Sequence, residues 1–447
     1  MKYLKQLIVA GLVLAAPNAS SAQGRGGPPG GLPGAFGAGP PGLGMGPPGM
    51  GVGRIGPPGP IGPPSIPGRP LVPPGLEVRS AVQSLERDLV GRPNDNRTVT
   101  AVITRDNLGT MIVRGEILAV SPNDQSLAIA RRLNFTVARQ DKLDELGITS
   151  VTLRAPAGMS ETEALTALRQ ADPDGTYDYA HIYNPTGDSS IQPGPAFPST
   201  ATQGAGIRIG MVDGGIGKDH HALKDATISS RTFADGDNGP PTLHGTAIAS
   251  LLIGKDRGFS GYLPGATLYA ADVFGGAADG GSAENIARAL NWLASNRIPV
   301  TNISLAGPPN ALLAAAVKGF VGTGHVLVAP VGNDGPAASP NFPAAYPGVV
   351  AVTSVDANKH IQADANRGTA MFAAPGVNVQ AAILPQGYAN VTGTSYAAPT
   401  VTANFALKVS APSASASKSA LSELEQTAMP LSAAAQAVRY LPPPAGM

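Results

Sequence analysis

The sequence predicts an α/β protein, with a large unit built on a parallel sheet flanked by helices and a small α+β unit preceding it. From residue 206 onward, short apolar runs alternate with helical patterns, which is typical of parallel sheets. Between residues 98 and 183, strand and helix patterns alternate over a stretch long enough for one small sandwich. The chain has 447 residues, 43% of them hydrophobic, so it can bury a substantial core.

The N-terminus has the features of an export signal, which we place at residues 1–22. Lys2 and Lys5 precede an apolar run over residues 7–16, and Ser20-Ser21-Ala22 offers the small side chains of a cleavage site. The run is shorter than the ~20 residues that span a bilayer, although an uncleaved anchor is the alternative. We therefore expect a secreted or periplasmic protein, with no membrane association after signal removal.

Residues 23–97 are dominated by Gly and Pro up to about residue 75, and Gly-Pro-Pro-Gly recurs four times. Such sequence cannot bury a core, and the glycine register breaks too often for a collagen-like triple helix. We interpret this region as a disordered linker; a specific interaction role is the alternative.

The region 98–183 predicts a small ferredoxin-like sandwich, because strand and helix alternate and one further strand fits the remaining length. Ser160 and Glu163 form a capping box at the start of the second helix. The expected strands are 116–120, 151–153 and 177–183, and the expected helices are 127–133 and 161–170.

A loop rich in Pro, Gly, Ser and Thr over 184–205 leads into the large unit, 206–430, and a tail follows over 431–447. We expect strands at 207–212, 267–274, 300–304, 326–331 and 349–355. We expect helices beginning near His244, after a cap at Ser282, and over 312–320, with one more near 421–429.

Composition excludes several classes of function. The formal net charge is +1, from 31 Lys and Arg against 30 Asp and Glu, so no long-range field favours nucleic acid. The chain has no cysteine, which excludes disulfides, thiolate zinc sites and a cysteine nucleophile together. Any nucleophile must be an oxygen or a lysine amine.

Three short motifs carry the groups that a serine hydrolase needs. Asp213 closes a predicted strand, His244 opens a helix, and Ser395 leads into another within Gly-Thr-Ser-Tyr-Ala-Ala-Pro. Hydrolysis by serine needs a hydroxyl, an imidazole to take its proton and a carboxylate to hold the imidazole. Singly, each residue could be a turn or capping residue, and the other five histidines lack such flanking motifs.

With these flanking residues and the order Asp, His, Ser, the chain resembles the subtilases, the subtilisin-like serine proteases, over about 206–409. The order itself matches the subtilisin example of the Ser-His-Asp triad. The resemblance implies a subtilisin-like fold, with Asp213 orienting the imidazole, His244 as general base and Ser395 as nucleophile. It also implies that Asn333 donates its side-chain amide to the oxyanion, although Asn333 could instead only stabilise its turn.

The same resemblance implies where an extended protein or peptide substrate binds, as an added β-strand. The two expected substrate-binding segments are Ser304, Leu305, Ala306 and Gly307 on one side and Gly280, Gly281 and Ser282 on the other. The chain departs from the family at Gly214, where a hydroxyl residue is usual, and at Ala306, whose methyl could narrow the primary pocket.

The region 116–183 is similar to subtilase propeptides, which assist folding and then inhibit the enzyme. We therefore expect a monomeric secreted endopeptidase made as a precursor that cleaves itself between Tyr183 and Gln203, with its propeptide as intramolecular inhibitor. The alternative is a catalytically silent binding protein on the same scaffold. No cofactor is expected for the chemistry, and no metal ligand is assigned, although 235–238 could be a calcium loop rather than a solvated turn.

Overall fold

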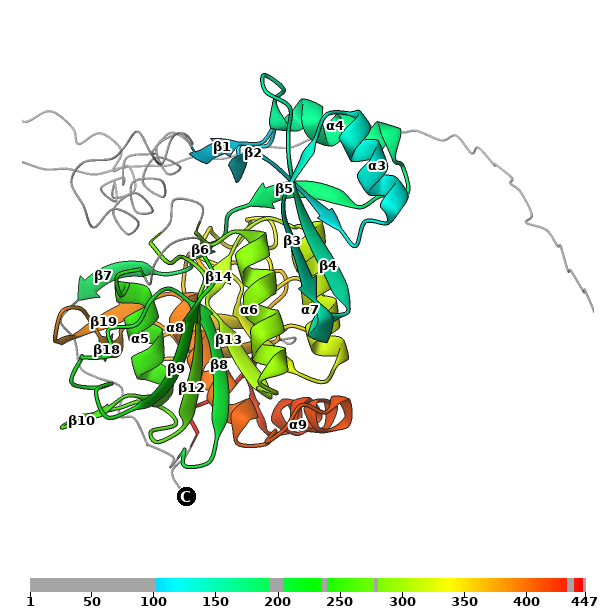
Figure 1. Cartoon of the computed structure of the whole chain (residues 1–447). Coiled ribbons are helices and arrows are strands. Elements are labelled where there is room, and N and C mark those ends of the chain that lie inside the picture. The colour runs from blue at the N-terminus through cyan, green and yellow to red at the C-terminus, as the bar shows by residue number, and fades with distance from the viewer. Residues whose placement is uncertain (1–101, 193–203, 235–238, 277–279, 432–437, 445–447) are drawn as a thin grey trace, which may run out of the picture. The chain divides into compact units, whose positions relative to one another are not determined.

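The computed structural model describes residues 102–192, 204–234, 239–276, 280–431 and 438–444 (Figure 1). The expected export signal, the Gly/Pro-rich linker, residues 193–203 of the loop before the large unit and the acidic stretch 235–238 lie outside these residues. Within the described part of the chain, no helix is long and apolar enough to cross a membrane.

The small unit is an antiparallel sheet with two helices on one face. In sequence its elements are β1 Ile103–Arg105, β2 Met111–Val120, α3 Asp124–Arg132, β3 Thr136–Leu143, β4 Ile148–Arg154, α4 Glu161–Ala171 and β5 Tyr177–His181. Strand β2 lies between β5 and β4, and β3 pairs with the outer side of β4. The expected strands and helices occur in the expected order, but the sheet has two further strands, β1 and β3, where the sequence left room for one.

The two faces of this sheet are covered differently. Helices α3 and α4 bury one face around Ile117, Leu153 and Leu168, and the predicted capping box of Ser160 and Glu163 starts α4. The opposite face carries apolar side chains, Leu118 among them, into a cluster shared with the large unit. The small unit therefore completes its packing on the large one.

The large unit is built on a nine-stranded sheet, in the order β20-β21-β17-β16-β15-β13-β8-β12-β9, parallel except for β20. Its strands are β8 Arg208–Asp213, β9 Thr227–Thr232, β12 Thr267–Asp272, β13 Val300–Ile303, β15 Val326–Pro330, β16 Val350–Val355, β17 Phe372–Pro375, β20 Met429–Pro430 and β21 Arg439–Tyr440. The five predicted strands are present, each with ends within two residues of the expected ones. Strand β21 lies in the expected tail and instead extends the sheet.

Helices cover both faces of this sheet (Figure 1). They are α5 Leu243–Ile253, α6 Ala283–Ser295, α7 Ala311–Gly322, α8 Thr394–Ala406 and α9 Ala414–Thr427. Helices α5 and α8 pack on one face, while α6 and α7 pack on the other and carry the small unit. Ser282 caps α6 as predicted, whereas α9 begins seven residues before the expected 421.

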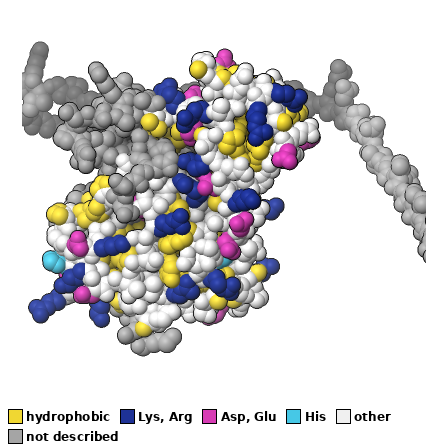
Figure 2. Space-filling view, viewed as in Figure 1, with side chains coloured by type: hydrophobic (Ala, Val, Ile, Leu, Met, Phe, Trp, Pro, Cys, Tyr) yellow, Lys and Arg dark blue, Asp and Glu magenta, His cyan; other side chains and the backbone are white. Residues whose placement is uncertain are grey.

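Short antiparallel pairs lie near the start of α8. Strand β6 Asn184–Pro185 pairs with β14 Leu305–Ala306, and β7 Asp188–Gln192 joins β19 Tyr388–Thr392 and β18 Val379–Ala382. Strands β6 and β7 both come from the stretch that follows the small unit. On the face drawn in Figure 2, Lys and Arg are interspersed with Asp and Glu, in line with the near-zero net charge.

Candidate active site

The candidate catalytic residues collect at the carboxyl ends of the parallel strands, where open α/β sheets place their sites. Asp213 is the last residue of β8, and His244 and Ser395 are the second residues of α5 and α8. Ser304 directly follows β13, the neighbour of β8 in the sheet.

Asp213 and His244 are in direct contact. The imidazole Nδ1 of His244 lies 3.0 Å from each carboxylate oxygen of Asp213, which is fully buried. The Gly214 amide also donates to the Asp213 carboxylate at 2.7 Å. With its proton on Nδ1, the imidazole presents Nε2 as its basic nitrogen, and that atom has no hydrogen-bond partner among the described residues.

Gly214 is explained by its neighbour Thr242, the N-cap of α5. A Cβ atom on Gly214 would lie 2.5 Å from the Thr242 hydroxyl oxygen and 2.7 Å from its methyl carbon. The Thr242 hydroxyl accepts the Gly245 amide and so starts the helix that carries His244. The missing hydroxyl at 214 therefore leaves room for this cap, and a backbone amide supports the carboxylate.

Ser395 is fully buried at the first turn of α8. Its hydroxyl donates to the Ser304 carbonyl at 3.2 Å and is hydrogen-bonded to the hydroxyl of Thr186. The contacts of the described residues include no hydrogen bond from Ser395 to His244. The imidazole of His244 nevertheless lies beside the start of α8: its ring centroid is 5.5 Å from that of Tyr396, the residue after Ser395.

Asn333 lies beside the turn that leads into α8. Its side-chain oxygen Oδ1 accepts hydrogen bonds from the Thr394 backbone amide at 3.1 Å and from the Gln362 side-chain amide at 3.3 Å. These two contacts fix which end of the Asn333 side chain faces away from the turn. Its amide nitrogen Nδ2 is buried and has no partner among the described residues, so a donor remains for a group in the cleft.

The two expected substrate-binding segments flank a stretch of this chain's own residues, 182–187. On one side, Leu305 pairs with Pro185 and Ala306 with Asn184, and the Thr186 amide donates to the Ser304 carbonyl at 3.4 Å.

On the other side, the Tyr183 amide donates to the Gly281 carbonyl at 2.9 Å, and Ile182 bridges to Ser282. Gly280 precedes them in the same buried loop. The Gly307 backbone pairs with Phe342, while the ring of Tyr183 in the bound stretch packs against Gly307.

Sequence reasoning missed two residues of this site. Thr186 contacts the Ser395 hydroxyl across 209 positions, and Gln362 orients Asn333. Neither residue stands in a recognisable motif, so no local signal could have found them. Among the described residues, no group of three or more His, Asp or Glu side chains is arranged to hold a metal ion.

Comparison with known proteins identifies a family and relatives. The model of the Subtilase family matches residues 204–439. The alkaline protease of Alkalihalobacillus alcalophilus is 30% identical over 292 residues, covering 64% of this chain and 76% of that protein. Subtilisin Savinase of Lederbergia lenta is 34% identical over 227 residues, covering 50% of this chain and 83% of that protein.

Among solved structures, fervidolysin from Fervidobacterium pennivorans, a keratinolytic enzyme related to subtilisin, matches with a TM-score of 0.54 and 20% identity. The match covers 66% of this chain and 54% of that one. At this identity the likeness concerns the fold alone.

Proposed function

Because the chain belongs to the subtilase family of serine-type endopeptidases, we propose that Asp213, His244 and Ser395 are the triad with which it hydrolyses peptide bonds. The observation that carries the proposal is the contact of Asp213 with both the imidazole and the Gly214 amide, which orients His244. This contact leaves Nε2 of His244 basic and free to take a proton.

In the proposed reaction, Ser395 rotates about its Cα–Cβ bond from the Ser304 carbonyl toward His244. His244 takes the hydroxyl proton as the oxygen attacks the substrate carbonyl, and later gives that proton to the leaving amine. The product of the first half is an acyl-enzyme, which water hydrolyses. The reaction needs no cofactor, because these residues supply both the proton transfer and the nucleophile.

Asn333 is the proposed side-chain donor of the oxyanion hole. Its Nδ2 is a buried donor with no partner in the described part of the chain, which is costly unless a ligand uses it. The backbone amides at the start of α8 add a second source of positive potential at the same end of the cleft. Charge that develops on the substrate oxygen would be stabilised at this point.

We further propose that the protein is exported and made as an inactive precursor, with the small unit as its propeptide. The charge pattern and apolar run of residues 1–22 support export. The stretch after β5 supports the inhibited state, since it occupies the segments expected to bind substrate and contacts the hydroxyl of Ser395. The small unit would then act as an intramolecular inhibitor until it dissociates.

A fluorophosphonate probe, which reacts with activated serines, tests the proposal. Wild-type protein sampled over time after secretion should become labelled as the small unit dissociates, and Ser395→Ala and His244→Ala should stay unlabelled while folded by circular dichroism. Loss of either group should lower turnover by about six orders of magnitude, the size known for subtilisin. A folded wild type that has released the small unit and remains unlabelled would instead support the silent binding protein.

A further inference from the structure

We propose that the first substrate of this protein is its own peptide bond between Thr186 and Gly187, and that Tyr183 is the specificity residue that sets this register. The inference rests on the proposed endopeptidase function of the same site. It assigns one bond within the stretch that the sequence left open between Tyr183 and Gln203.

Backbone hydrogen bonds fix the register of the bound stretch. Tyr183 is held by the Gly281 carbonyl, Asn184 and Pro185 pair with β14, and the Thr186 amide reaches the Ser304 carbonyl. The ladder ends at Thr186. Since the Ser395 hydroxyl also donates to the Ser304 carbonyl, the last residue of the ladder and the nucleophile share one acceptor.

The peptide bond after Thr186 crosses the turn that precedes the nucleophile. A Cβ atom on Gly393 would lie 3.4 Å from the Thr186 carbonyl oxygen, 3.4 Å from Nδ2 of Asn333 and 2.7 Å from the Gly187 Cα atom. The Thr186 carbonyl oxygen and the Asn333 amide, which has no partner among the residues described, thus lie around the same point. The hydroxyl of Ser395 contacts the side chain of the same threonine, so nucleophile and oxyanion donor both meet at this residue.

Tyr183, the fourth residue on the amino side of this bond, anchors the stretch. Its side chain is fully buried, and its hydroxyl donates to the Pro308 carbonyl at 2.7 Å. Its ring packs so closely on Gly307 that a Cβ there would lie 2.6 Å from the ring, and its carbonyl would lie 2.5 Å from a Cβ on Gly281. Gly307 therefore makes room for the ring, which favours an aromatic residue at this position of a substrate, and Gly281 makes room for the backbone.

The residue after the bond must lack a side chain. A Cβ atom on Gly187 would lie 2.8 Å from the ring of Tyr396, which is fully buried and cannot move aside cheaply. Beyond Gly187 the backbone of β7 pairs with β19, so the chain is held on both sides of the bond. The recognised sequence is Tyr-Asn-Pro-Thr before the bond and Gly after it.

The cleavage balances without any added reactant except water. Ser395 Oγ bonds to the Thr186 carbonyl carbon, the bond to the Gly187 nitrogen breaks, and the Oγ proton passes through His244 Nε2 to that nitrogen. Water then hydrolyses the ester, leaving a carboxylate at Thr186 and an amine at Gly187. The small unit keeps residues 183–186 in the cleft as a bound product, while the new N-terminus is free to leave.

The test follows the full-length chain after expression, using intact-mass measurement and N-terminal sequencing of the first cleaved species. We expect one fragment that ends at Thr186 and one that begins Gly187-Asp188-Ser189, with Ser395→Ala uncleaved. Probe-labelled enzyme whose first cut lies elsewhere would overturn the assignment of the bond and leave the proposed function standing. No cleavage with no labelling would overturn the proposed function, and cleavage of Ser395→Ala at this bond would overturn self-cleavage.

Two variants test the specificity residues. Gly187→Ala should slow the first cut about 100-fold, because its methyl displaces the bond from Ser395. The matched control Gly368→Ala should be as fast as wild type, since nothing lies within 4 Å of a Cβ there.

Tyr183→Ala should slow the first cut about 100-fold as well, and Tyr183→Phe, which keeps the ring, by about tenfold or less. An unchanged rate in Gly187→Ala or Tyr183→Ala would contradict the proposed register.

Discussion

The two sheets of this molecule are closed in different ways. The nine-stranded sheet has helices on both faces, and its central strands are buried except at Arg208, the first residue of β8. The five-stranded sheet has its own helices on one face only and uses α6 and α7 of the large unit as the cover of the other. The nine-stranded sheet is covered by helices of its own unit, and the five-stranded sheet needs helices of the large unit to cover its second face.

Polar groups take part in the contact between the five-stranded sheet and helices α6 and α7. Glu284, in the first turn of α6, accepts Nε of Arg139 at 2.7 Å and the Thr152 hydroxyl at 2.8 Å. Burial alone would raise the pKa of Glu284, but the hydrogen bond and charge of Arg139 outweigh it and lower that pKa. The contact is therefore made with the charged carboxylate.

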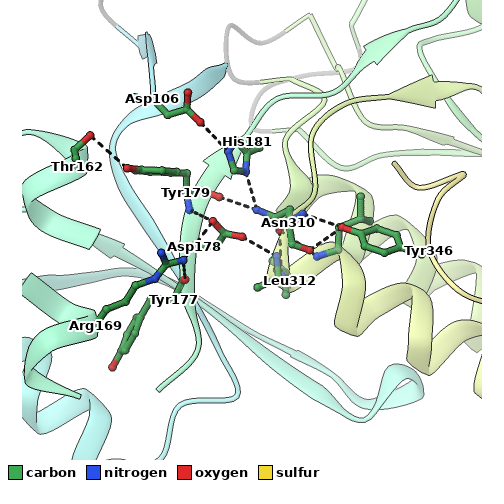
Figure 3. Close-up of polar contacts among 12 residues, drawn as sticks. Asp106, Thr162, Arg169, Tyr177, Asp178, Tyr179, His181, Asn310, Leu312 and Tyr346 are labelled. Atoms are coloured by element: carbon green, nitrogen blue, oxygen red, sulfur yellow. Dashed lines mark hydrogen bonds and ion pairs between the residues drawn. The ribbon is translucent and has the colours of Figure 1, made fainter. Parts of the chain in front are cut away.

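A second set of polar contacts joins β5 to the start of α7 (Figure 3). Asp178 accepts the Ala311 amide at 2.8 Å, and the Asn310 side chain donates to the Tyr179 carbonyl at 2.8 Å and lies 3.1 Å from His181 Nδ1. Groups of this kind are solvated again on separation, unlike apolar surface. The large unit thus covers its sheet with its own helices, whereas the small unit depends on contacts with α6 and α7 that include many polar groups.

The largest effect that we expect on the processed enzyme comes from Asn333, which takes part in the proposed reaction and not in the docking of the small unit. Asn333→Ala should lower kcat of that enzyme by about 10²–10³-fold with little change in KM, because the oxyanion donor acts in the transition state. Asn333→Asp keeps an oxygen for the Thr394 amide and should lose as much. Steady-state kinetics on a peptide substrate measure both, and recovery of the rate in Asn333→Asp would reduce Asn333 to a turn residue.

Breaking the buried ion pair should loosen the small unit and leave catalysis alone. Arg139→Ala leaves Glu284, whose side chain is 2% exposed, without its charged partner. The cost should be about 2–4 kcal/mol of docking free energy, or roughly 30- to 1,000-fold faster opening. Hydrogen exchange of the Tyr183 amide, which donates to the Gly281 carbonyl, measures the opening in uncleaved Ser395→Ala protein.

Arg132→Ala, at an exposed arginine of α3, is the matched control and should exchange like the parent. The processed Arg139→Ala enzyme should keep wild-type kcat. Equal exchange in the two arginine variants would mean that the ion pair of Arg139 and Glu284 contributes nothing to holding the small unit.

The same contrast explains what the sequence could predict. The central strands of the large sheet are apolar runs ended by small or polar residues, so 300–304 and 326–331 were recognisable, and Ser282 and Ser160 marked helix starts. The motifs at a strand end and a helix start likewise pointed to Asp213 and His244, which the structure brings into contact.

The missed parts depend on distant contacts. Strand β3 reads Thr-Val-Ala-Arg-Gln-Asp-Lys-Leu and is mostly exposed, so it lacks the alternation that signals a strand. Its Arg139 meets Glu284 145 positions away. Thr186 likewise acquires its role only through its contact with Ser395, 209 positions away. No local pattern records such pairs.

The smallest effect tests how much of the docking is electrostatic. The Asp178 carboxylate accepts the Ala311 amide at the N-terminus of α7. A negative charge at this position is stabilised by the positive end of the helix dipole. Asp178→Asn keeps an oxygen acceptor and loses only the charge, so it should cost about 0.3–1 kcal/mol, or about two- to fivefold faster exchange of the Ala311 amide. Asp178→Ala also loses the hydrogen bond and should exchange faster still.

At 1 M salt the difference between wild type and Asp178→Asn should shrink, because the charge is screened over about 3 Å. If Asp178→Asn and Asp178→Ala behave alike at both salt concentrations, the charge carries the whole contact and the hydrogen bond contributes nothing to holding β5 on α7.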